Sequence, residues 1–426
     1  MSSERIKKLC EYIDQNKAKN YPIENAMLYE SEDFIKNGYL RMLAVVLQVG
    51  NNITEGQLNL YKRIVEGASA ENTTEEYMRQ AMEIEIQEYT DFVNSCKEGQ
   101  LRYRFLLDAI LLAADGDNKE EQLKFIASFC EDIKMSKEEL DYLASMAKAI
   151  LEQSEAEYVD TFVEKSLEDI SEKLFAEYMN AIFDRQDKIY VSDNAVLFRP
   201  LSKSDITASS IEAIQQAKQP YVRIIGANIN LAEWKLDLTI TGKKCVRFEN
   251  CVFSGKGKHE IISEGSIVLK DCKEVVIDDC KFDKFDIQVL KIRGIGDLQI
   301  NNSKFINCSY CCESNEAGFA GVIHSNDPKS NSNIKIKECE FKQCGCREGT
   351  ASDDIQCISN CDTELERCSF IECCYIYSCT VDKTTKNITF LKNGFHDFED
   401  YGYDSTLFTP KSKAINCTFK NSAKFN

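Results

Sequence analysis

The chain has 426 residues and a formal net charge of −18, and its 43% hydrophobic content is enough for two hydrophobic cores. Residues 1–190 contain 22 Lys and Arg against 38 Asp and Glu, a charge of −16, which opposes binding to nucleic-acid phosphates by this half. No apolar run is long enough to span a membrane, and residues 1–8 lack the apolar segment of a secretory signal, so we expect a cytoplasmic protein.

Residues 1–190 show helical periodicity and contain one proline, Pro22. Ser136, followed three residues later by Glu139, is typical of a helix start. Asp115-Gly116-Asp117 follows a long apolar run and precedes an acidic stretch, as expected of a turn before a helix N-terminus. We therefore predict an acidic all-α domain over residues 1–190.

This helical region contains two related halves. A shift of 65 residues aligns Glu55-Gly-Gln57-Leu58 with Glu120-Glu-Gln122-Leu123, and Met42–Val49 with Leu107–Ala114. The two half-repeats, the Ala-Asp-Gly turn and the Glu-Glu pair after it make residues 25–155 similar to the tellurite-resistance TerB family.

The TerB resemblance implies a divalent cation held by Asp115, Asp117 and Glu121, and a role in stress response or phage defence. The first half departs from this pattern, because residues 50–52 read Gly-Asn-Asn where the second half has Asp-Gly-Asp. Half of the acidic set is therefore missing, and acids at a helix start are also favourable without any metal.

Residues 191–220 are predicted to form a linker with a short amphipathic helix, Ile206–Ala217, that ends before Pro220. Stacked repeats need covered ends, so we expect this helix to cover the first repeat.

A short phrase recurs through the second half of the chain. It ends in phenylalanine, two residues after a small or polar residue, at seven places: Phe253, Phe282, Phe305, Phe341, Phe370, Phe395 and Phe419. Alternating apolar residues around each phrase predict short strands, and spacings of 23 to 36 residues predict stacked units with the phenylalanines in one interior stack. Residues 221–426 resemble the right-handed parallel β-helix of the pectate-lyase-like superfamily. The expected fold class is thus α+β multidomain, a helical domain followed by a parallel β-helix.

Seventeen of the 20 cysteines follow residue 240, and several occupy the small position of the repeat. In a cytoplasmic chain we expect these to be free, buried thiols. Zinc is the alternative, although no CxxC pair is present to anchor a site. Its ligands would come from neighbouring repeats: Cys311, Cys312, Cys344, Cys346, Cys357, Cys361, Cys373 and Cys374.

Enzymes with a β-helix fold usually act on polysaccharides with paired carboxylates and an Arg or Lys base. The best pairs are Asp278-Asp279 and Asp353-Asp354, with Lys291 and Arg293 as bases. Adjacent residues in a strand point to opposite faces, so neither pair is a ready acid–base couple. The three histidines also lie outside known catalytic or zinc motifs: His259, His324 and His396.

We therefore favour a non-enzymatic interaction or scaffold protein. The last repeat is followed by only a few residues, so we expect a protein partner or a second copy to dock there through Phe419 and Phe425. The alternatives are a β-helix carbohydrate-active lyase or hydrolase, and a divalent-metal sensor acting through Asp115, Asp117 and Glu121.

Overall fold

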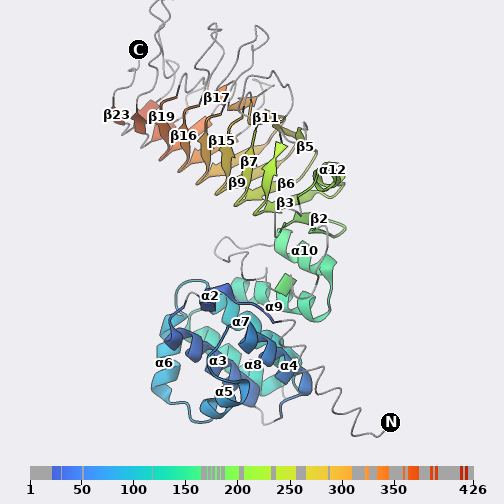
Figure 1. The fold of residues 1–426 in the computed structure, drawn as a ribbon, viewed down its shortest axis with the longest axis vertical. Coiled ribbons are helices and arrows are strands. Elements are labelled where there is room, and N and C mark those ends of the chain that lie inside the picture. Colours follow the sequence, from blue (N-terminus) through green and yellow to red (C-terminus); the bar gives the residue numbers. More distant parts are fainter. Residues whose placement is uncertain are drawn as a thin grey trace, which may run out of the picture. The chain divides into compact units, whose positions relative to one another are not determined.

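The computed structural model divides the chain into two compact units, Met1–Arg185 and Gln186–Asn426. The first is helical and the second is rich in parallel sheets, an α+β arrangement (Figure 1). The structure describes residues 22–29, 31–49, 52–117, 119–164, 170, 174, 178–179, 183, 188–200, 206–231, 237–255, 265–285, 288–308, 322–325, 333–344, 358–359, 363–373, 384–386, 389–391, 413–415 and 418–420.

The described helices of the first unit begin where their sequences carry caps. Ser136 accepts a hydrogen bond from the backbone N–H of Glu139, which confirms the predicted helix start, and Thr54 and Thr73 cap two further helices in the same way. These helices are α2 (Ala26–Tyr29), α3 (Asp33–Gln48), α4 (Glu55–Gly67), α5 (Thr74–Ala81), α6 (Ile86–Ser95), α7 (Leu101–Ala114), α8 (Lys119–Asp132), α9 (Lys137–Leu151) and α10 (Glu155–Glu164).

Helix α3 lies at the centre of the unit and packs against α4, α5, α6, α7 and α8. Aromatic side chains fill the space between α3, α6, α7 and α8. The ring of Phe105 lies 5.5 Å from that of Tyr39, 4.9 Å from that of Phe92 and 4.8 Å from that of Phe129. These contacts hold the two related halves together through one apolar core.

The second unit begins with structure that the sequence pattern did not reveal. Strands β1 (Ile189–Val191) and β2 (Ala195–Phe198) form an antiparallel pair, where we had predicted the end of the helical domain and a linker. The predicted amphipathic helix is confirmed as α12 (Ala208–Gln216). It packs against β5 (Leu238–Thr241) and buries Ile211 and Ile214 in the apolar interior of this unit.

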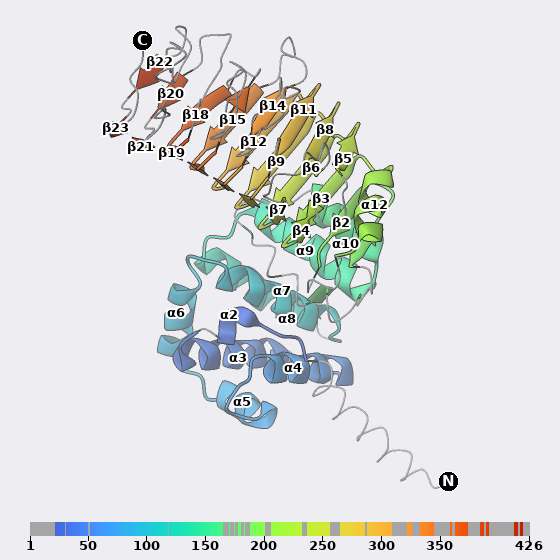
Figure 2. The ribbon, with the colours of Figure 1, turned by 45° about the horizontal axis from the view of Figure 1, so that its top comes forward.

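From β3 to β19, successive strands join three parallel sheets in rotation, and the described strands β20 to β23 alternate between the first and second sheets (Figure 2). Strand β3 pairs with β6 and β6 with β9, while β4, β7 and β10 join a second sheet and β5, β8 and β11 a third. The first sheet contains β1, β2, β3 (Tyr221–Ile225), β6 (Cys245–Glu249), β9 (Glu274–Asp278), β12 (Asp297–Asn301), β15 (Asn333–Lys337), β18 (Thr363–Glu366), β20 (Thr384–Lys386) and β22 (Lys413–Ile415).

The other two sheets have the same parallel register. The second contains β4 (Asn228–Asn230), β7 (Val252–Ser254), β10 (Lys281–Asp283), β13 (Lys304–Ile306), β16 (Glu340–Lys342), β19 (Ser369–Ile371), β21 (Thr389–Leu391) and β23 (Thr418–Lys420). The third contains β5, β8 (Ile267–Lys270), β11 (Leu290–Arg293), β14 (Ile323–Ser325) and β17 (Ile358–Ser359).

The phenylalanine stack is confirmed for the repeats whose side chains are described. Neighbouring rings along the second sheet lie 4.6 to 5.3 Å apart and are parallel within 9°, and all are fully buried: Phe253, Phe282, Phe305, Phe341 and Phe370. Each phenylalanine also pairs in register with its neighbour through the main chain.

The prediction of Phe395 as the sixth phenylalanine of the stack is wrong. The register aligns Phe370 with Phe390 and Phe390 with Phe419, so Phe390, rather than Phe395, holds the equivalent position. Our pattern required a small residue two positions before the ring, whereas the repeat is defined by main-chain pairing. In this repeat Thr389-Phe390-Leu391 supplies the strand without that small residue.

Candidate functional site

The acidic turn predicted to bind metal contacts the start of helix α4. The backbone carbonyl of Asp115 accepts a hydrogen bond from Thr54 Oγ1 at 3.1 Å, and Asp117 Oδ2 accepts one from Asn52 Nδ2 at 3.0 Å. A Cβ atom placed on Gly56 would lie only 1.9 Å from Asp115 Oδ2, so the carboxylate lies against the first turn of α4. A negative charge there is favourable for the helix dipole.

Glu121, the third predicted ligand, has a different partner. Its Oε1 lies 2.8 Å from Lys124 Nζ on the same helix, and both side chains are exposed. Within the described part of the chain, no group of three or more His, Cys, Asp or Glu side chains is placed to hold a metal ion. Asp115 and Asp117 thus lie in one turn, but the three predicted ligands Asp115, Asp117 and Glu121 do not form one group.

Two residues at equivalent positions of the related halves, Gln57 and Gln122, form a buried pair. Gln57 Nε2 donates to the carbonyl of Leu112 at 2.8 Å and to Gln122 Oε1 at 3.2 Å, while Gln122 Nε2 donates to the carbonyl of Val46 at 3.0 Å. Each glutamine therefore satisfies a carbonyl in the last turn of a helix from the other half. The alignment of Gln57 with Gln122 in the sequence was the sign of this contact, but we had used it only as evidence for the family resemblance.

A second polar cluster is fully buried in the helical unit. Asp108 accepts hydrogen bonds from Arg104 Nε at 2.9 Å, from Tyr39 Oη at 2.6 Å and from Tyr178 Oη at 2.7 Å. Burial, reinforced by the Asp108 charge, raises the pKa of Tyr39 well above its usual value. Because Asp108 has three donors and no exposed surface, we assign this cluster a structural role.

In the sheet unit, the predicted acid and base residues lie on different sheets. Asp278 ends β9 of the first sheet and Asp279 occupies the turn after it, whereas Lys291 and Arg293 belong to β11 of the third sheet. Lys291 Nζ lies 3.8 Å from Asp237 Oδ2. The other pair, Asp353-Asp354, is outside the described residues. The described candidates therefore do not form one acid–base site.

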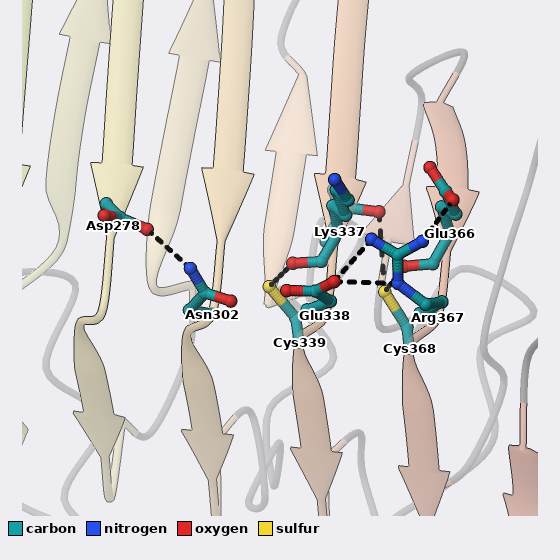
Figure 3. Close-up of polar contacts among 9 residues, drawn as sticks. Asp278, Asn302, Lys337, Glu338, Cys339, Glu366, Arg367 and Cys368 are labelled. Carbon is teal, nitrogen blue, oxygen red and sulfur yellow. Dashed lines mark hydrogen bonds and ion pairs between the residues drawn. The ribbon is translucent and has the colours of Figure 1, made fainter. Parts of the chain in front are cut away.

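The turn residues after the first sheet make polar contacts between neighbouring repeats, as Figure 3 shows. Asn302 Nδ2 donates to Asp278 Oδ1 at 3.0 Å, and Arg367 Nε donates to Glu338 Oε1 at 2.7 Å. Burial raises the pKa of Asp278, and the nearby Glu249 carboxylate adds to this shift. These contacts join exposed turns and leave no described cleft at this edge.

Seven cysteines of the sheet unit form two columns, and the Sγ of each donates to a backbone carbonyl of the preceding repeat. The first column contains Cys251, Cys280, Ser303, Cys339 and Cys368. Its four thiols contact, in this order, the carbonyls of Ile224, Phe248, Ile300 and Ile336 at 3.4 to 3.5 Å. The second column contains Cys308, Cys344 and Cys373.

All eleven described cysteines are free and buried, as predicted. The zinc candidates Cys344 and Cys373 belong to the second column. The other six zinc candidates lie outside the described residues, as do His259 and His396, while His324 is buried on β14. The thiols of the two columns thus fill the interior and donate to backbone carbonyls.

A pocket lies between helices α3 and α6. It has a volume of about 250 Å³, and most of its wall is apolar: Phe34, Ile35, Met42, Ile84 and Phe92, with Asn37, Gly38, Arg41, Glu88 and Ser95 completing it. Phe34 is 63% exposed at the start of α3, Met82, which follows α5, is 77% exposed, and Ile86, the first residue of α6, is 80% exposed.

The Arg41–Glu88 ion pair closes one side of this pocket. Arg41 Nη1 and Nη2 donate to the two Glu88 carboxylate oxygens at 2.6 and 2.9 Å, and these hydrogen bonds lower the pKa of Glu88. The Nε of Arg41 is buried and has no acceptor among the described residues. The lining of the pocket therefore combines an apolar wall with one ion pair, and a mostly apolar lining with a few polar groups is the usual composition of a binding site.

Phe419, predicted to contact a partner, lies on β23, the last strand of the second sheet, while its side chain and Phe425 are outside the described residues.

Over the described ranges, no helix has the length and apolar character needed to cross a membrane. No protein-family model, curated protein or solved structure matches this chain.

Proposed function

We propose that this protein is a non-enzymatic interaction scaffold, built from a TerB-like helical domain and a right-handed parallel β-helix. The rotation of successive strands through three parallel sheets, with phenylalanines and thiols stacked between repeats, supports the β-helix assignment. The related helical halves, joined through Gln57 and Gln122, support a TerB-like domain.

The α3–α6 pocket is the observation that carries the proposed role. A large apolar surface exposed at a concave site on a soluble domain marks a place where another molecule binds. Phe34 exposes such surface in the lining of a pocket that the described part of the helical unit leaves unfilled, and the exposed Met82 and Ile86 lie two residues to either side of the lining residue Ile84. We therefore assign the docking of a protein partner to this pocket.

The experiment compares two variants of the full chain that each add one charge to an exposed apolar position. Phe34→Glu places the charge at the pocket, and Leu123→Glu places it on α8, where Leu123 is 49% exposed and does not line the pocket. Proteins that co-purify from the native host are identified by mass spectrometry, and the leading candidate is then purified and its affinity for each chain measured. We expect Phe34→Glu to weaken binding at least tenfold and Leu123→Glu to leave it unchanged. Equal binding by both variants would place the partner elsewhere and overturn the assignment.

We also propose that the scaffold acts in a cytoplasmic stress-response or phage-defence assembly, which is the context that the TerB resemblance implies. Deletion of the gene followed by exposure to tellurite and to phages tests this context separately from the pocket. Unchanged survival under both conditions would remove the context and leave the binding assignment to be judged by the variants above.

A further inference from the structure

We propose that the segment bound in the α3–α6 pocket is cationic and inserts one large apolar side chain. This inference rests on the proposed docking function and specifies the chemistry of the partner. It depends on two features of the same site, its size and its charge.

The size of the pocket favours a side-chain anchor. Sites for small molecules and cofactors usually have volumes of about 300–1,000 Å³. The α3–α6 pocket, at about 250 Å³, is smaller than that range and has an apolar wall that includes Ile35, Met42 and Phe92. One aromatic or long aliphatic side chain, inserted from a segment lying across Phe34 and Ile84, matches this space and its chemistry.

The charge around the pocket is strongly negative. The segments 32–42 and 83–95, which form its walls, contain six acidic residues and two basic ones, a net charge of −4: Glu32, Asp33, Glu83, Glu85, Glu88 and Asp91 against Lys36 and Arg41. Arg41 is already paired with Glu88, so it does not offset the remaining acids. Glu32, Asp33, Glu83 and Glu85 are exposed, so their carboxylates are available to Lys or Arg of a partner.

The inference is tested by selecting binders from a random peptide display library on the immobilised full chain. We expect the enriched peptides to carry a net positive charge and one Phe, Trp, Leu or Met that cannot be replaced by Ala. Phe34→Glu should weaken their binding at least tenfold, and Leu123→Glu should leave it within about twofold. Raising the ionic strength from about 0.01 M to 1 M, which shortens the screening length from about 30 to 3 Å, should weaken binding at least tenfold.

The outcomes separate this inference from the proposed function. If the enriched peptides are neutral or acidic but bind Phe34→Glu more weakly than the wild type, the inference that the partner is cationic is wrong and the docking site is retained. Peptides that bind Phe34→Glu as well as the wild type, or no enrichment at all, would overturn both.

A parallel selection uses a chain that starts at residue 22, because residues 1–21 contain five Lys or Arg. Pocket-dependent binders obtained only on that shorter chain would identify the chain's own N-terminal segment as the occupant and overturn the partner proposal.

Discussion

Gln57 and Gln122 show how a sequence repeat becomes a structural contact. Their amides hydrogen-bond to each other and to carbonyls of the opposite half. Gly116 makes this possible, because a Cβ atom there would lie 2.4 Å from Gln57 Nε2 and 2.5 Å from Gln122 Oε1. The acidic turn is therefore constrained by packing against the glutamine pair, independently of any ligand.

Replacing Gln122 with Ala should lower the free energy of unfolding by about 1–3 kcal/mol, because it removes the side-chain donor to the buried Val46 carbonyl and one of the two acceptors of the Gln57 amide. Urea unfolding followed by circular dichroism measures the change. Gln87→Ala, at an exposed site on α6, is the control and should change stability by less than about 0.5 kcal/mol. Equal losses in the two variants would contradict the role of the buried pair.

Asp115→Ala tests the divalent-cation proposal at Asp115, Asp117 and Glu121. We expect a loss of about 0.3–1 kcal/mol from the missing charge beside the N-terminus of α4, and the same loss with and without Ca²⁺, Mg²⁺ or Zn²⁺. Thermal unfolding of both chains with each metal measures this. If metal stabilises the wild type but not Asp115→Ala, the cation proposal is supported and our expectation is wrong.

The stacked strands depend on equivalent side chains meeting in successive repeats. Phe305 contacts Phe282 and Phe341 with ring centroids 4.6 and 4.7 Å apart. We expect Phe305→Ala to cost about 3–5 kcal/mol, because it removes a buried aromatic ring and leaves a cavity. Val276→Ala, on the half-buried outer face of β9, is the control and should cost less than about 1 kcal/mol in the same urea titration. A loss below 1 kcal/mol for Phe305→Ala would show that the stack is not a tightly packed core.

The first cysteine column predicts a loss of stability in alkali. Hydrogen bonding to Cys368 and burial both raise the pKa of Cys339 above its ordinary value of 9.0, and Cys280, beside Cys251, is shifted in the same direction. Above pH 9 the unfolded chain loses thiol protons that the folded chain keeps. The stabilisation from these neutral thiols is therefore complete below pH 9 and falls as the pH rises.

Unfolding free energies measured from pH 7 to pH 11 should decline above pH 9. Each such thiol contributes up to about 1.4 kcal/mol per pH unit. Cys339→Ser is the matched variant, because Ser303 already occupies the same column and donates to the carbonyl of Asn301. The variant should show a shallower decline than the wild type. Identical slopes would show that Cys339 does not titrate differently in the folded and unfolded states.

At the scale of the whole molecule, we propose that the last described repeat takes part in self-association. Strands β22 and β23 end the first and second sheets, and no further described strand pairs with either. Unpaired strand edges recruit other strands, so we expect the full chain to form dimers or larger assemblies through this end. Light scattering should give a mass above 48.5 kDa, reduced by Phe425→Glu and unchanged by Leu151→Glu on α9, where Leu151 is 44% exposed. A strictly monomeric wild type would remove the self-association proposal.

Local signals in the sequence determined the helical first half, the start of α9 at Ser136 and most positions of the phenylalanine stack. Capping depends on residues three apart, and a strand's inward and outward faces alternate along its own sequence. A repeated local pattern therefore specifies repeated local structure. The prediction succeeded at Phe253 through Phe370 because each repeat carries the same alternation.

Contacts between distant residues could be decided only by the tertiary structure. Main-chain register selected Phe390 over Phe395. The α3–α6 pocket joins residues about 50 positions apart, such as Arg41 and Glu88, whose pairing no local pattern predicts. Long-range packing likewise placed the predicted metal ligand Asp115 against α4, because its neighbours depend on how whole helices meet, whereas Glu121 pairs locally with Lys124 on its own helix.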